Sequence, residues 1–235
     1  MRYFPPLGVA KMGRYTQNRI FSQNEMKKIE AAHVCVVGCG GLGGYVLELL
    51  ARLGVGEITV VDGDSLQESN LNRQILSREA NLGSSKVKAA EKRISSINSK
   101  IKLHALNKFL TPENAVEIIS EMDLVIDALD GIETRKILAQ ACATENLVLV
   151  HAAIAGWYGQ ISTIFPGDQT LQKIYKSDLK KGIESSLGNP SFTPALLAAL
   201  QVSEAVKILL GKKDVLRNKL LYIDLLTNDF EMLEF

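Results

Sequence analysis

The sequence predicts an α/β fold, namely a doubly wound, Rossmann-like and mostly parallel sheet with antiparallel strands appended at its C-terminal end. Three observations support this class. Apolar strand patterns alternate with helical patterns over the first two thirds of the chain, a glycine-rich segment joins the first strand to the next helix, and the last residues carry a hairpin pattern. Repeated strand–helix units form parallel sheets because each helix crosses back over the sheet before the next strand begins.

The first strand–helix–strand unit has the clearest pattern. An apolar strand is predicted over 33–38, then a helix over 41–53 whose leucines and valines recur at helical spacing, then a second strand over 57–62. Gly54 and Gly56 follow the helix and indicate its C-terminal end. This unit therefore begins the alternation.

The alternation continues along the chain and then changes. The segment 123–129 is nearly all apolar, as is typical of a parallel strand buried on both faces. Pro112 favours the first turn of a helix that opens at 111–114. The apolar helix over 194–210 carries several polar residues, which indicates a buried amphipathic helix rather than a membrane span. The remaining predicted elements are helices over 22–31, 84–98 and 132–145, strands over 101–106, 147–153, 160–165, 220–226 and 229–235, and a polar loop over 166–190.

Length and composition bound the function classes. At 235 residues and 25.7 kDa, with 46% apolar and 23% charged residues, we expect one soluble domain over 1–235. A formal net charge of +1 gives no electrostatic case for a nucleic-acid or membrane partner. The three cysteines form no C-x-x-C pair and the N-terminal segment lacks the apolar core of a secretion signal, so we expect a cytoplasmic protein without structural zinc.

The glycine segment predicts a phosphate-binding loop. Gly38-x-Gly40-x-x-Gly43 matches the dinucleotide fingerprint between a strand and a helix, where the helix N-terminus favours an anion. Asp62 follows about 20 residues later at a strand end, the position from which a carboxylate reaches a ribose hydroxyl. The pattern supports a bound adenosine cofactor but does not distinguish NAD from ATP. The alternative is that the glycines serve only a tight turn.

Two basic residues follow the second strand. Arg73 lies in the polar run 69–74 (SNLNRQ), and a lone loop arginine is usually solvated or paired at the surface. Lys86 falls in the first turn of the predicted helix, where the helix dipole disfavours a cation. A lysine in that position is easier to explain if an anion binds nearby.

Two acidic residues mark the end of the strand over 123–129. Asp127 and Asp130 lie at its carboxyl end, where open α/β sheets bind their ligands. A carboxylate there suits Mg²⁺, which takes one or two carboxylates together with phosphate oxygens. The alternatives are a turn-capping role for Asp127 and helix N-capping for Asp130, which precedes Gly131.

These residues together predict a phosphate site without a nucleophile or a general base. Arg73, Lys86, Asp130 and the glycine loop supply two cations, a carboxylate for a metal ion and backbone amides. Such a site suits attack by an incoming carboxylate on a nucleotide phosphorus, which needs mainly positioning and charge stabilisation. It suits hydride transfer poorly.

The chain resembles the ThiF/MoeB/HesA group, the bacterial relatives of ubiquitin-activating enzymes. SNLNRQ followed by the spaced lysine is highly specific for that group, whereas the glycine loop is not. The resemblance covers nearly the whole chain, and it rests on VVGCGGLGG (36–44), GVGEITVVDGD (54–64), SNLNRQ (69–74), GSSKVKAA (83–90), DLVIDALD (123–130), GQISTIFPG (159–167) and LQVSEAVKILLG (200–211).

The resemblance implies an ATP-dependent adenylyltransferase that acts on the C-terminal glycine of a small ubiquitin-like sulfur-carrier protein ending in Gly-Gly. It implies a homodimer and three parts, namely an N-terminal arm and helix (1–32), a nucleotide-binding core (33–153) and a carrier-binding and dimer part (154–235). The catalytic set that it implies is Arg73, Lys86 and Asp130, with Asp130 organising Mg²⁺. The cofactor-binding set that it implies is Gly38, Gly40, Gly41, Gly43, Asp62, Asp64, Asn70, Arg73 and Lys86, joined by Arg19 from the other subunit.

The sequence departs from the family pattern near the N-terminus. The family has an arginine that crosses into the partner's ATP site, and Gln17 stands at that position here. Arg19 or Arg14 is the candidate substitute. The paired C-x-x-C motifs that bind zinc in many members are absent, so the resemblance also predicts no zinc.

The cysteines are not placed for a covalent carrier intermediate. The 166–190 segment contains none, Cys35 and Cys142 are expected to be buried in a strand and a helix, and Cys39 is expected to be a small packing residue. We therefore expect adenylation without an enzyme thioester, with sulfur delivered by another protein.

Three alternatives stay open. FLTPEN (109–114) is similar to the tRNA-modifying dehydratases of the same superfamily, Gln17 leaves room for a catalytically silent scaffold subunit, and the glycine loop alone also suits a nicotinamide oxidoreductase. Trp157-Tyr158 and the loop after Pro166 are candidates for contact with the carrier's tail, against ordinary packing at a strand edge. We expect structural roles for the histidines, which form no visible constellation: His33, His104 and His151.

Overall fold

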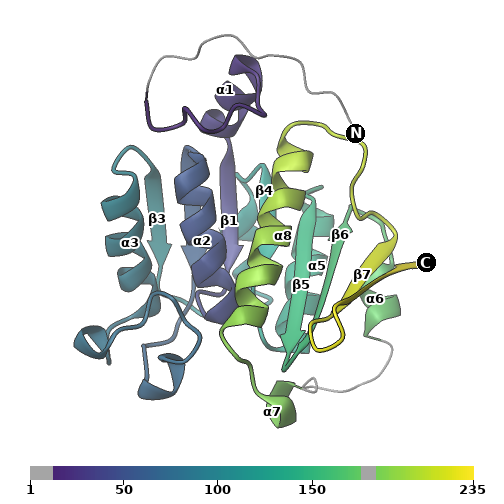
Figure 1. The fold of residues 1–235 in the computed structure, drawn as a ribbon. Coiled ribbons are helices and arrows are strands. Elements are labelled where there is room, and N and C mark those ends of the chain that lie inside the picture. Colours follow the sequence, from purple (N-terminus) through teal and green to yellow (C-terminus); the bar gives the residue numbers. More distant parts are fainter. Residues whose placement is uncertain (1–12, 176–183) are drawn as a thin grey trace.

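The strands of the protein form one sheet. In the computed structural model, which describes residues 13–175 and 184–235, eight strands lie in the order β3-β2-β1-β4-β5-β6-β7-β8 (Figure 1). Strands β1 to β5 are parallel, and the pairs that β6, β7 and β8 form are antiparallel. The predicted class, a doubly wound and mostly parallel sheet with appended antiparallel C-terminal strands, is confirmed.

The strands and helices alternate along the chain. The strands are β1 (His33–Val37), β2 (Glu57–Val61), β3 (Lys102–Leu106), β4 (Leu124–Asp127), β5 (Leu149–Ala155), β6 (Tyr158–Ile164), β7 (Lys219–Asp224) and β8 (Asp229–Glu234). The helices are α1 (Gln23–Ala31), α2 (Gly41–Leu53), α3 (Lys86–Ile97), α4 (Ala115–Ile119), α5 (Ile132–Thr144), α6 (Thr170–Ile174), α7 (Glu184–Leu187) and α8 (Phe192–Leu209), with 3₁₀ turns η1 (Glu68–Asn70) and η2 (Glu79–Asn81).

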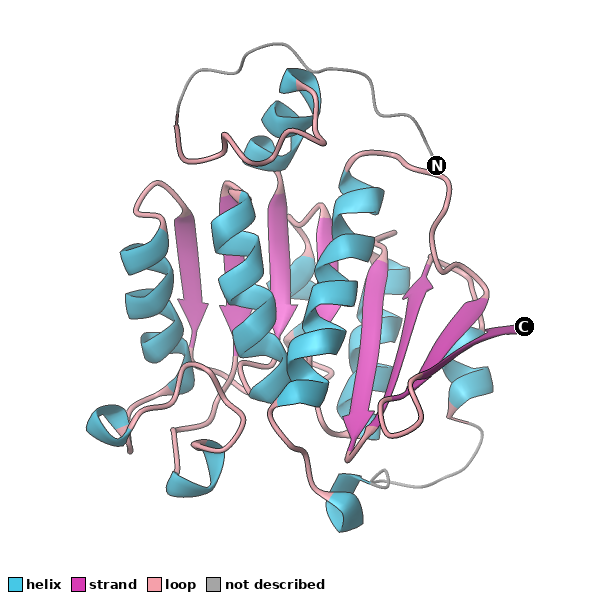
Figure 2. Cartoon of the chain, in the orientation of Figure 1, coloured by secondary structure: helices cyan, strands magenta, loops and turns pink. Residues whose placement is uncertain are grey.

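Helices cover both faces of the sheet. Helices α2, α3 and α8 lie on the face nearer the viewer in Figure 1, and α4 and α5 lie on the other face. Alternate strand residues point to opposite faces, so Val34 and Val36 pack in the first hydrophobic cluster and Cys35 and Val37 in the second. The loops that follow β1, β2 and β4 emerge together at the carboxyl edge of the sheet, below the arrowheads in Figure 2.

The order of the strands places a crevice at this edge. Strand β1 has β2 on one side and β4 on the other. The chain therefore winds from β1 toward one side of the sheet and later fills the other side, so the loops after β1 and β4 diverge. Open α/β sheets bind ligands at such a point.

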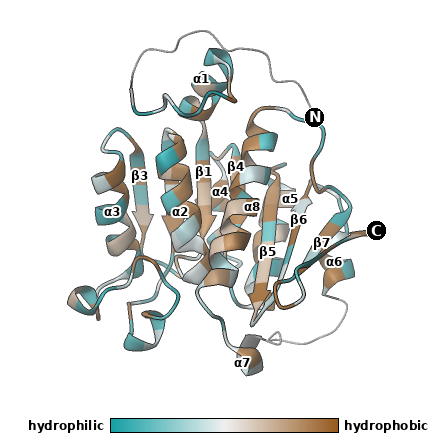
Figure 3. Cartoon of the chain, viewed as in Figure 1, coloured by the Kyte–Doolittle hydropathy of each residue, from teal (hydrophilic) through white to brown (hydrophobic). Residues whose placement is uncertain are grey.

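Helix α8 is long and apolar enough, by length and composition alone, to cross a membrane. It packs instead against α2 and the strands of the sheet, with Leu197, Ala198 and Ala205 fully shielded from solvent. Figure 3 shows apolar colour on α8 and on the central strands beneath it. The predicted amphipathic helix is thus part of the core of this domain.

The structure differs from the prediction in several short segments. Turns η1 and η2 were not predicted, because three-residue helices carry no periodicity. The segment 166–190, predicted to be a loop, contains α6 and α7, and its residues 176–183 lie outside the described residues. Pro112 lies in a turn before α4 rather than in its first helical turn, and α4 begins at Ala115.

Candidate functional site

A cavity of about 320 Å³ lies at the carboxyl edge, between the loops that follow β1, β2 and β4. Two larger cavities, of about 640 Å³ near α5 and α6 and about 530 Å³ near α2 and α8, contain none of the predicted site residues. The predicted site residues that line the carboxyl-edge cavity are Gly38, Gly40, Gly41, Asp62, Asp64, Arg73, Lys86 and Asp130. The residues predicted from the sequence therefore come from five separate segments that the fold brings to one cavity.

The glycines of the loop serve two different purposes. Gly38 has φ +96°, and a Cβ there would lie 2.4 Å from the carbonyl oxygen of Ala128. A Cβ on Gly43 would lie 1.9 Å from the carbonyl oxygen of Gly38. These two glycines are required by the packing of the chain on itself, and Gly43 does not line the cavity.

Gly40 and Gly41 meet no such demand. A Cβ on Gly40 would have nothing nearer than Gln74 Nε2 at 3.6 Å, and one on Gly41 would meet only the Arg73 side chain at 3.4 Å and Pro194 at 3.7 Å. They form the start of α2, whose first-turn N–H groups have no acceptor within the helix. Bare backbone at a helix N-terminus that faces a cavity is suited to close approach by an anion.

Asp62 shapes the loop as well as lining the cavity. Its Oδ2 accepts the Cys39 N–H at 2.7 Å and its Oδ1 accepts the Asp64 N–H at 2.8 Å. The carboxylate thus ties the glycine loop to the end of β2, and its ribose-binding role stays a prediction.

Lys86 is placed where the sequence predicts it, in the first turn of α3, but its explanation changes. The Lys86 Nζ lies 2.8 Å from Asp64 Oδ2 and 4.0 Å from Asp62 Oδ2. These two carboxylates stabilise the buried ammonium against the helix dipole, so its position does not by itself require a bound anion. Ser85 occupies the N-cap position of α3, yet its side chain does not cap the helix.

Among the residues that the structure describes, Arg73 is a cation without an acidic partner. Its Nη1 donates to the Ser69 carbonyl oxygen and to Asn72 Oδ1, both at 2.9 Å, and it forms no ion pair within the described part of the chain. Its side chain also lies beside Gly41. The guanidinium is therefore held next to the start of α2 with its charge uncompensated.

Asp130 is an acidic residue that, like Arg73, lines the cavity without an ion-pair partner among the described residues. It is exposed, lines the cavity, and has no hydrogen bond or ion pair among residues 13–175 and 184–235. The N-cap position of α5 belongs to Gly131, so the alternative of N-capping by Asp130 is wrong. A carboxylate that lines the same cavity as Arg73, and that is unpaired within the described chain, has the donor chemistry that Mg²⁺ accepts alongside phosphate oxygens.

Besides Gly43, two predicted residues do not line this cavity. Asn70 is buried and its Oδ1 accepts the Gln67 N–H at 3.0 Å, while its carbonyl oxygen accepts the N–H groups of Arg73 and Gln74. Asn70 therefore builds the loop that carries Arg73. Arg19 precedes α1 at the opposite, amino edge of the sheet, where its Nε donates to the Thr16 carbonyl oxygen at 3.3 Å.

A buried charged network beneath the cavity was missed from the sequence. Asp127, fully buried, contacts His151 Nδ1 at 2.7 Å and Arg135 Nη1 at 3.4 Å through its Oδ2. The Tyr175 hydroxyl lies 3.3 Å from His151 Nε2, and Gln201 of α8 donates to the Asp127 carbonyl oxygen at 2.8 Å. Arg135 and Tyr175 also line the cavity, so this network forms its floor.

The charges in this network are fixed by burial and pairing. Burial alone would raise the pKa of Asp127, but the Arg135 charge and the His151 hydrogen bond outweigh it and hold that pKa below its ordinary value. Burial lowers the pKa of His151, which the hydrogen bond with Asp127 offsets only in part. The native network is therefore an aspartate–arginine ion pair with a neutral histidine.

The expectation that the histidines form no constellation is wrong. His151 belongs to the buried network, and His33 and His104 meet Glu57 near the amino edge of the sheet. Their partners are 24 to 47 residues away in sequence, so only the strand register reveals them. His33 lies opposite Glu57 between β1 and β2, and Thr59 lies opposite His104 between β2 and β3.

Two amide side chains of the cavity have an oxygen without a partner. Gln74 Oε1 and Asn189 Oδ1 are buried and accept no hydrogen bond within the described chain. Phe109 is exposed and packs its ring over Gly63, where a Cβ would lie 2.7 Å from it. The cavity thus offers hydrogen-bond acceptors and an aromatic surface in addition to its charges. Of these features, the sequence could have indicated only the aromatic one, because Phe109 follows the predicted strand over 101–106.

All three cysteines are buried, as predicted. Burial raises the pKa of the Cys35 thiol to about 12 and raises those of Cys39 and Cys142 as well. Thiols so shielded are poor nucleophiles, because the thiolate is the reactive form.

Comparison with known proteins places this geometry in context. The ThiF family model matches residues 13–235. The probable molybdopterin-synthase adenylyltransferase of Porphyra purpurea is 33% identical over 226 residues, which are 93% of this chain and 59% of that protein. The sulfur carrier protein ThiS adenylyltransferase of Bacillus subtilis is 33% identical over 208 residues, 86% of this chain and 62% of that protein. This chain spans less than two thirds of the length of either relative.

Other similar proteins match along more of their length. The SAMP-activating enzyme E1 of Haloferax volcanii is 28% identical over 235 residues, 97% of this chain and 87% of that protein. The solved E. coli tRNA N6-threonylcarbamoyladenosine dehydratase TcdA, in complex with ATP, is 25% identical with a TM-score of 0.71 and covers 82% of this chain and 91% of that one. E. coli MccB with ATP has a TM-score of 0.80 at 20% identity over 97% of this chain and 72% of that one, which shows the fold alone.

Proposed function

The chain belongs to the ThiF family, and on that premise we propose that its carboxyl-edge cavity carries out an ATP-dependent adenylation. The carboxylate that it activates is the C-terminal glycine of a small ubiquitin-like sulfur-carrier protein. The single observation that carries the proposal is that one cavity, at the bare start of α2, is lined by an arginine, Arg73, and a carboxylate, Asp130, neither of which has an ion-pair partner among the described residues. Relatives named as sulfur-carrier and molybdopterin-synthase adenylyltransferases support the substrate class.

In this reaction the protein forms no covalent bond to the substrate. A carboxylate oxygen of the carrier attacks the α-phosphorus of ATP, the bond from that phosphorus to the pyrophosphate oxygen breaks, and pyrophosphate leaves. The attacking carboxylate is already ionised near neutral pH, so no general base is required. Catalysis then rests on positioning and on stabilising the charge that develops on the phosphate oxygens.

Each cavity residue has a role in this scheme. The amides of Gly40 and Gly41 hold phosphate, and Arg73 stabilises the charge of the leaving pyrophosphate. Lys86 contributes in the same way once a phosphate competes with Asp64 for its ammonium. Asp130 would hold Mg²⁺, which neutralises phosphate charge when bound.

The carrier's tail enters from the carboxyl edge in this proposal. Trp157 lies in the turn after β5 at that edge, partly exposed, with its ring 4.6 Å from the Phe192 ring between centroids. Ala153 and Ile154 of β5 line the cavity just before this turn. The buried cysteines support transfer without an enzyme thioester.

We also infer a homodimer. Arg19 and Arg14 are exposed at the end of the molecule opposite their own cavity, so neither acts within its own chain. Either would reach an ATP site only by crossing to a partner subunit, in place of the family's arginine, where this chain has Gln17.

A tRNA-modifying dehydratase is the second candidate, favoured by the 91% coverage of TcdA. Both functions activate a substrate with ATP, so the substrate discriminates them. Exchange of labelled pyrophosphate into ATP is expected with a recombinant sulfur carrier ending in Gly-Gly and not with tRNA. The reverse result would replace the proposal with the second candidate, and ATP binding without exchange in either case would indicate a silent scaffold subunit.

Arg73→Ala tests the site itself. We expect carrier-dependent exchange to fall by about 10²–10³-fold, the typical cost of removing one group that stabilises transition-state charge. Arg78→Ala is the matched control, since Arg78 is an exposed arginine of the same loop outside the cavity. Equal activity of the two variants would remove Arg73 from the site.

A further inference from the structure

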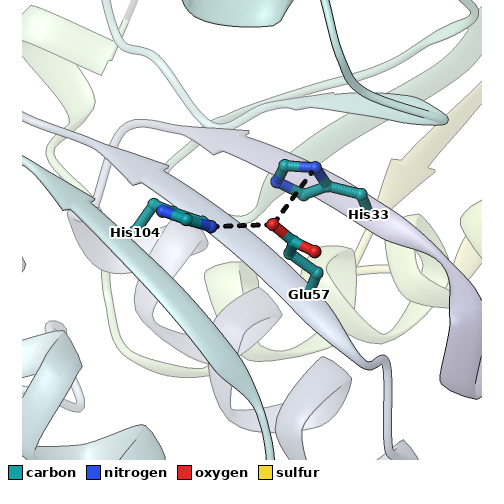
Figure 4. A group of neighbouring side chains, drawn as sticks. All are labelled: His33, Glu57 and His104. Carbon is teal, nitrogen blue, oxygen red and sulfur yellow. Dashed lines mark hydrogen bonds and ion pairs between the residues drawn. The ribbon is translucent and has the colours of Figure 1, made fainter.

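Three potential metal ligands converge at the amino edge of the sheet, away from the cavity. Figure 4 shows His33 and His104 on either side of the Glu57 carboxylate. The His104 Nε2 lies 2.7 Å and the His33 Nδ1 3.7 Å from Glu57 Oε1. One ligand atom from each residue can be chosen so that all three lie within 4.8 Å of one another.

The sheet register creates this cluster. The residues come from three neighbouring parallel strands, β1, β2 and β3, at positions that share one face of the sheet. The side chains of His33, Glu57 and His104 are 15%, 28% and 40% exposed. The backbone of the sheet therefore fixes the three residues, and their side chains remain accessible to an ion from solvent.

We propose that His33, Glu57 and His104 form a binding site for a divalent transition-metal ion of the zinc class. Two imidazole nitrogens and one carboxylate oxygen are a ligand set that zinc accepts with a fourth position left to water, whereas Mg²⁺ and Ca²⁺ prefer oxygen ligands. Bonds of about 2.0–2.2 Å place tetrahedral ligands roughly 3.3–3.5 Å apart, so side-chain shifts of about 1 Å close the site. The sequence-based expectation of no zinc concerned cysteine pairs, and this site uses none.

A second contact orients one ligand. The Thr59 hydroxyl lies 2.8 Å from His33 Nε2, which leaves His33 Nδ1 directed toward Glu57. Histidine ligands in proteins are held in this way, by a hydrogen bond at the ring nitrogen that does not bind the metal.

Lys102 is the competitor that a metal ion must displace. Its Nζ lies 2.7 Å from Glu57 Oε1, and its side chain is 66% exposed. The cluster without metal is thus an ion pair supported by two histidines. An exposed lysine turns into solvent at small cost, because ion pairs at the protein surface contribute little to stability.

The competition gives a test that a merely structural ion pair would fail. Zn²⁺ is titrated by calorimetry into the tag-free full chain, and Co²⁺ binding is followed by its visible absorption. We expect one ion per chain, with affinity lowered about tenfold or more in His104→Ala and in Glu57→Gln. Lys102→Gln is expected to raise the affinity, because it frees the Glu57 oxygen.

The control for Lys102→Gln is Lys219→Gln. Lys219 also lies on a strand and pairs with a glutamate of the next strand, Glu234, at 3.1 Å. It should leave metal affinity unchanged, and melting temperatures without metal show whether each variant is folded. Absence of stoichiometric binding in both the unmodified protein and Lys102→Gln would overturn the proposal, as would binding that survives His104→Ala. These outcomes are independent of adenylation.

Discussion

Two aspartates three residues apart show two uses of charge in this fold. Asp127 is fully buried and paired with Arg135 and His151, whereas Asp130 is exposed in the cavity and unpaired within the described chain. The arginines repeat the contrast, since Arg135 is buried and paired and Arg73 forms no ion pair with a described residue. Paired charges build the floor of the cavity, and unpaired charges are left for a ligand.

Replacing each aspartate by alanine tests the contrast most strongly. Asp127→Ala leaves the Arg135 charge buried without compensation, and we expect the free energy of unfolding to fall by about 3–5 kcal/mol. Asp130→Ala should change it by no more than about 0.5 kcal/mol, as at other exposed positions, while carrier-dependent pyrophosphate exchange falls by about 10²–10³-fold. Urea unfolding and exchange assays measure the two effects.

The reverse stability effects of the two substitutions would contradict the contrast between a structural Asp127 and a ligand-binding Asp130. A strongly destabilised Asp130→Ala would mean that its carboxylate has a structural role. A fully stable Asp127→Ala would mean that the buried ion pair contributes no net stability.

The glycine loop extends the comparison from charges to backbone. Gly38→Ala forces a side chain into a positive-φ position against the Ala128 carbonyl oxygen, so we expect a loss of about 2 kcal/mol in the free energy of unfolding. Gly40→Ala should leave stability nearly unchanged and weaken ATP binding about tenfold, because the added methyl group keeps phosphate from approaching the backbone N–H closely enough for a hydrogen bond. Calorimetric ATP titration of both variants measures this, and tight ATP binding by Gly40→Ala would show that phosphate does not approach this backbone.

The smallest expected effect is a pH dependence that originates in the buried network. The pKa of His151 is lowered in the native protein by burial, so between that value and about pH 6.5 the unfolded chain binds more protons than the native one. The free energy of unfolding should therefore fall as the pH is lowered below about 6.5, at about 1.4 kcal/mol per pH unit for this one group. His151→Gln should reduce that slope in denaturation curves taken from pH 7.5 to 5, and an identical slope would exclude His151 as its source.

The fold was predictable because its signals are local. The alternation of apolar strands and amphipathic helices, with glycines after α2, gives the order of the elements and the class of the sheet. The short pieces α6, η1 and η2 were missed because a single turn has no period to detect. Their formation depends on the loops and caps around them.

The candidate site was predictable only where its residues stand in a motif. Arg73 and Asp130 follow strand ends, so a parallel sheet brings them to one edge whatever the details. The network of Asp127, Arg135 and His151 depends on which strand lies beside β4 and on which face of α5 points inward. The partners of Lys86 also depend on the fold. The position of Lys86 at the start of a helix does not indicate that its ammonium pairs with Asp64.

The strand order also governs how the chain acquires its structure. Central strand β1 pairs with β2 early in the chain, but its other partner begins at Leu124, which pairs with Val34 from 90 residues away. Until β4 docks, β1, whose Val34 to Val37 are buried in the folded protein, has an open edge of N–H and C=O groups, the kind of edge that other chains can pair with. The nascent or refolding protein is thus exposed to aggregation through the strand that later carries its glycine loop, and closure of that long-range pair ends the exposure.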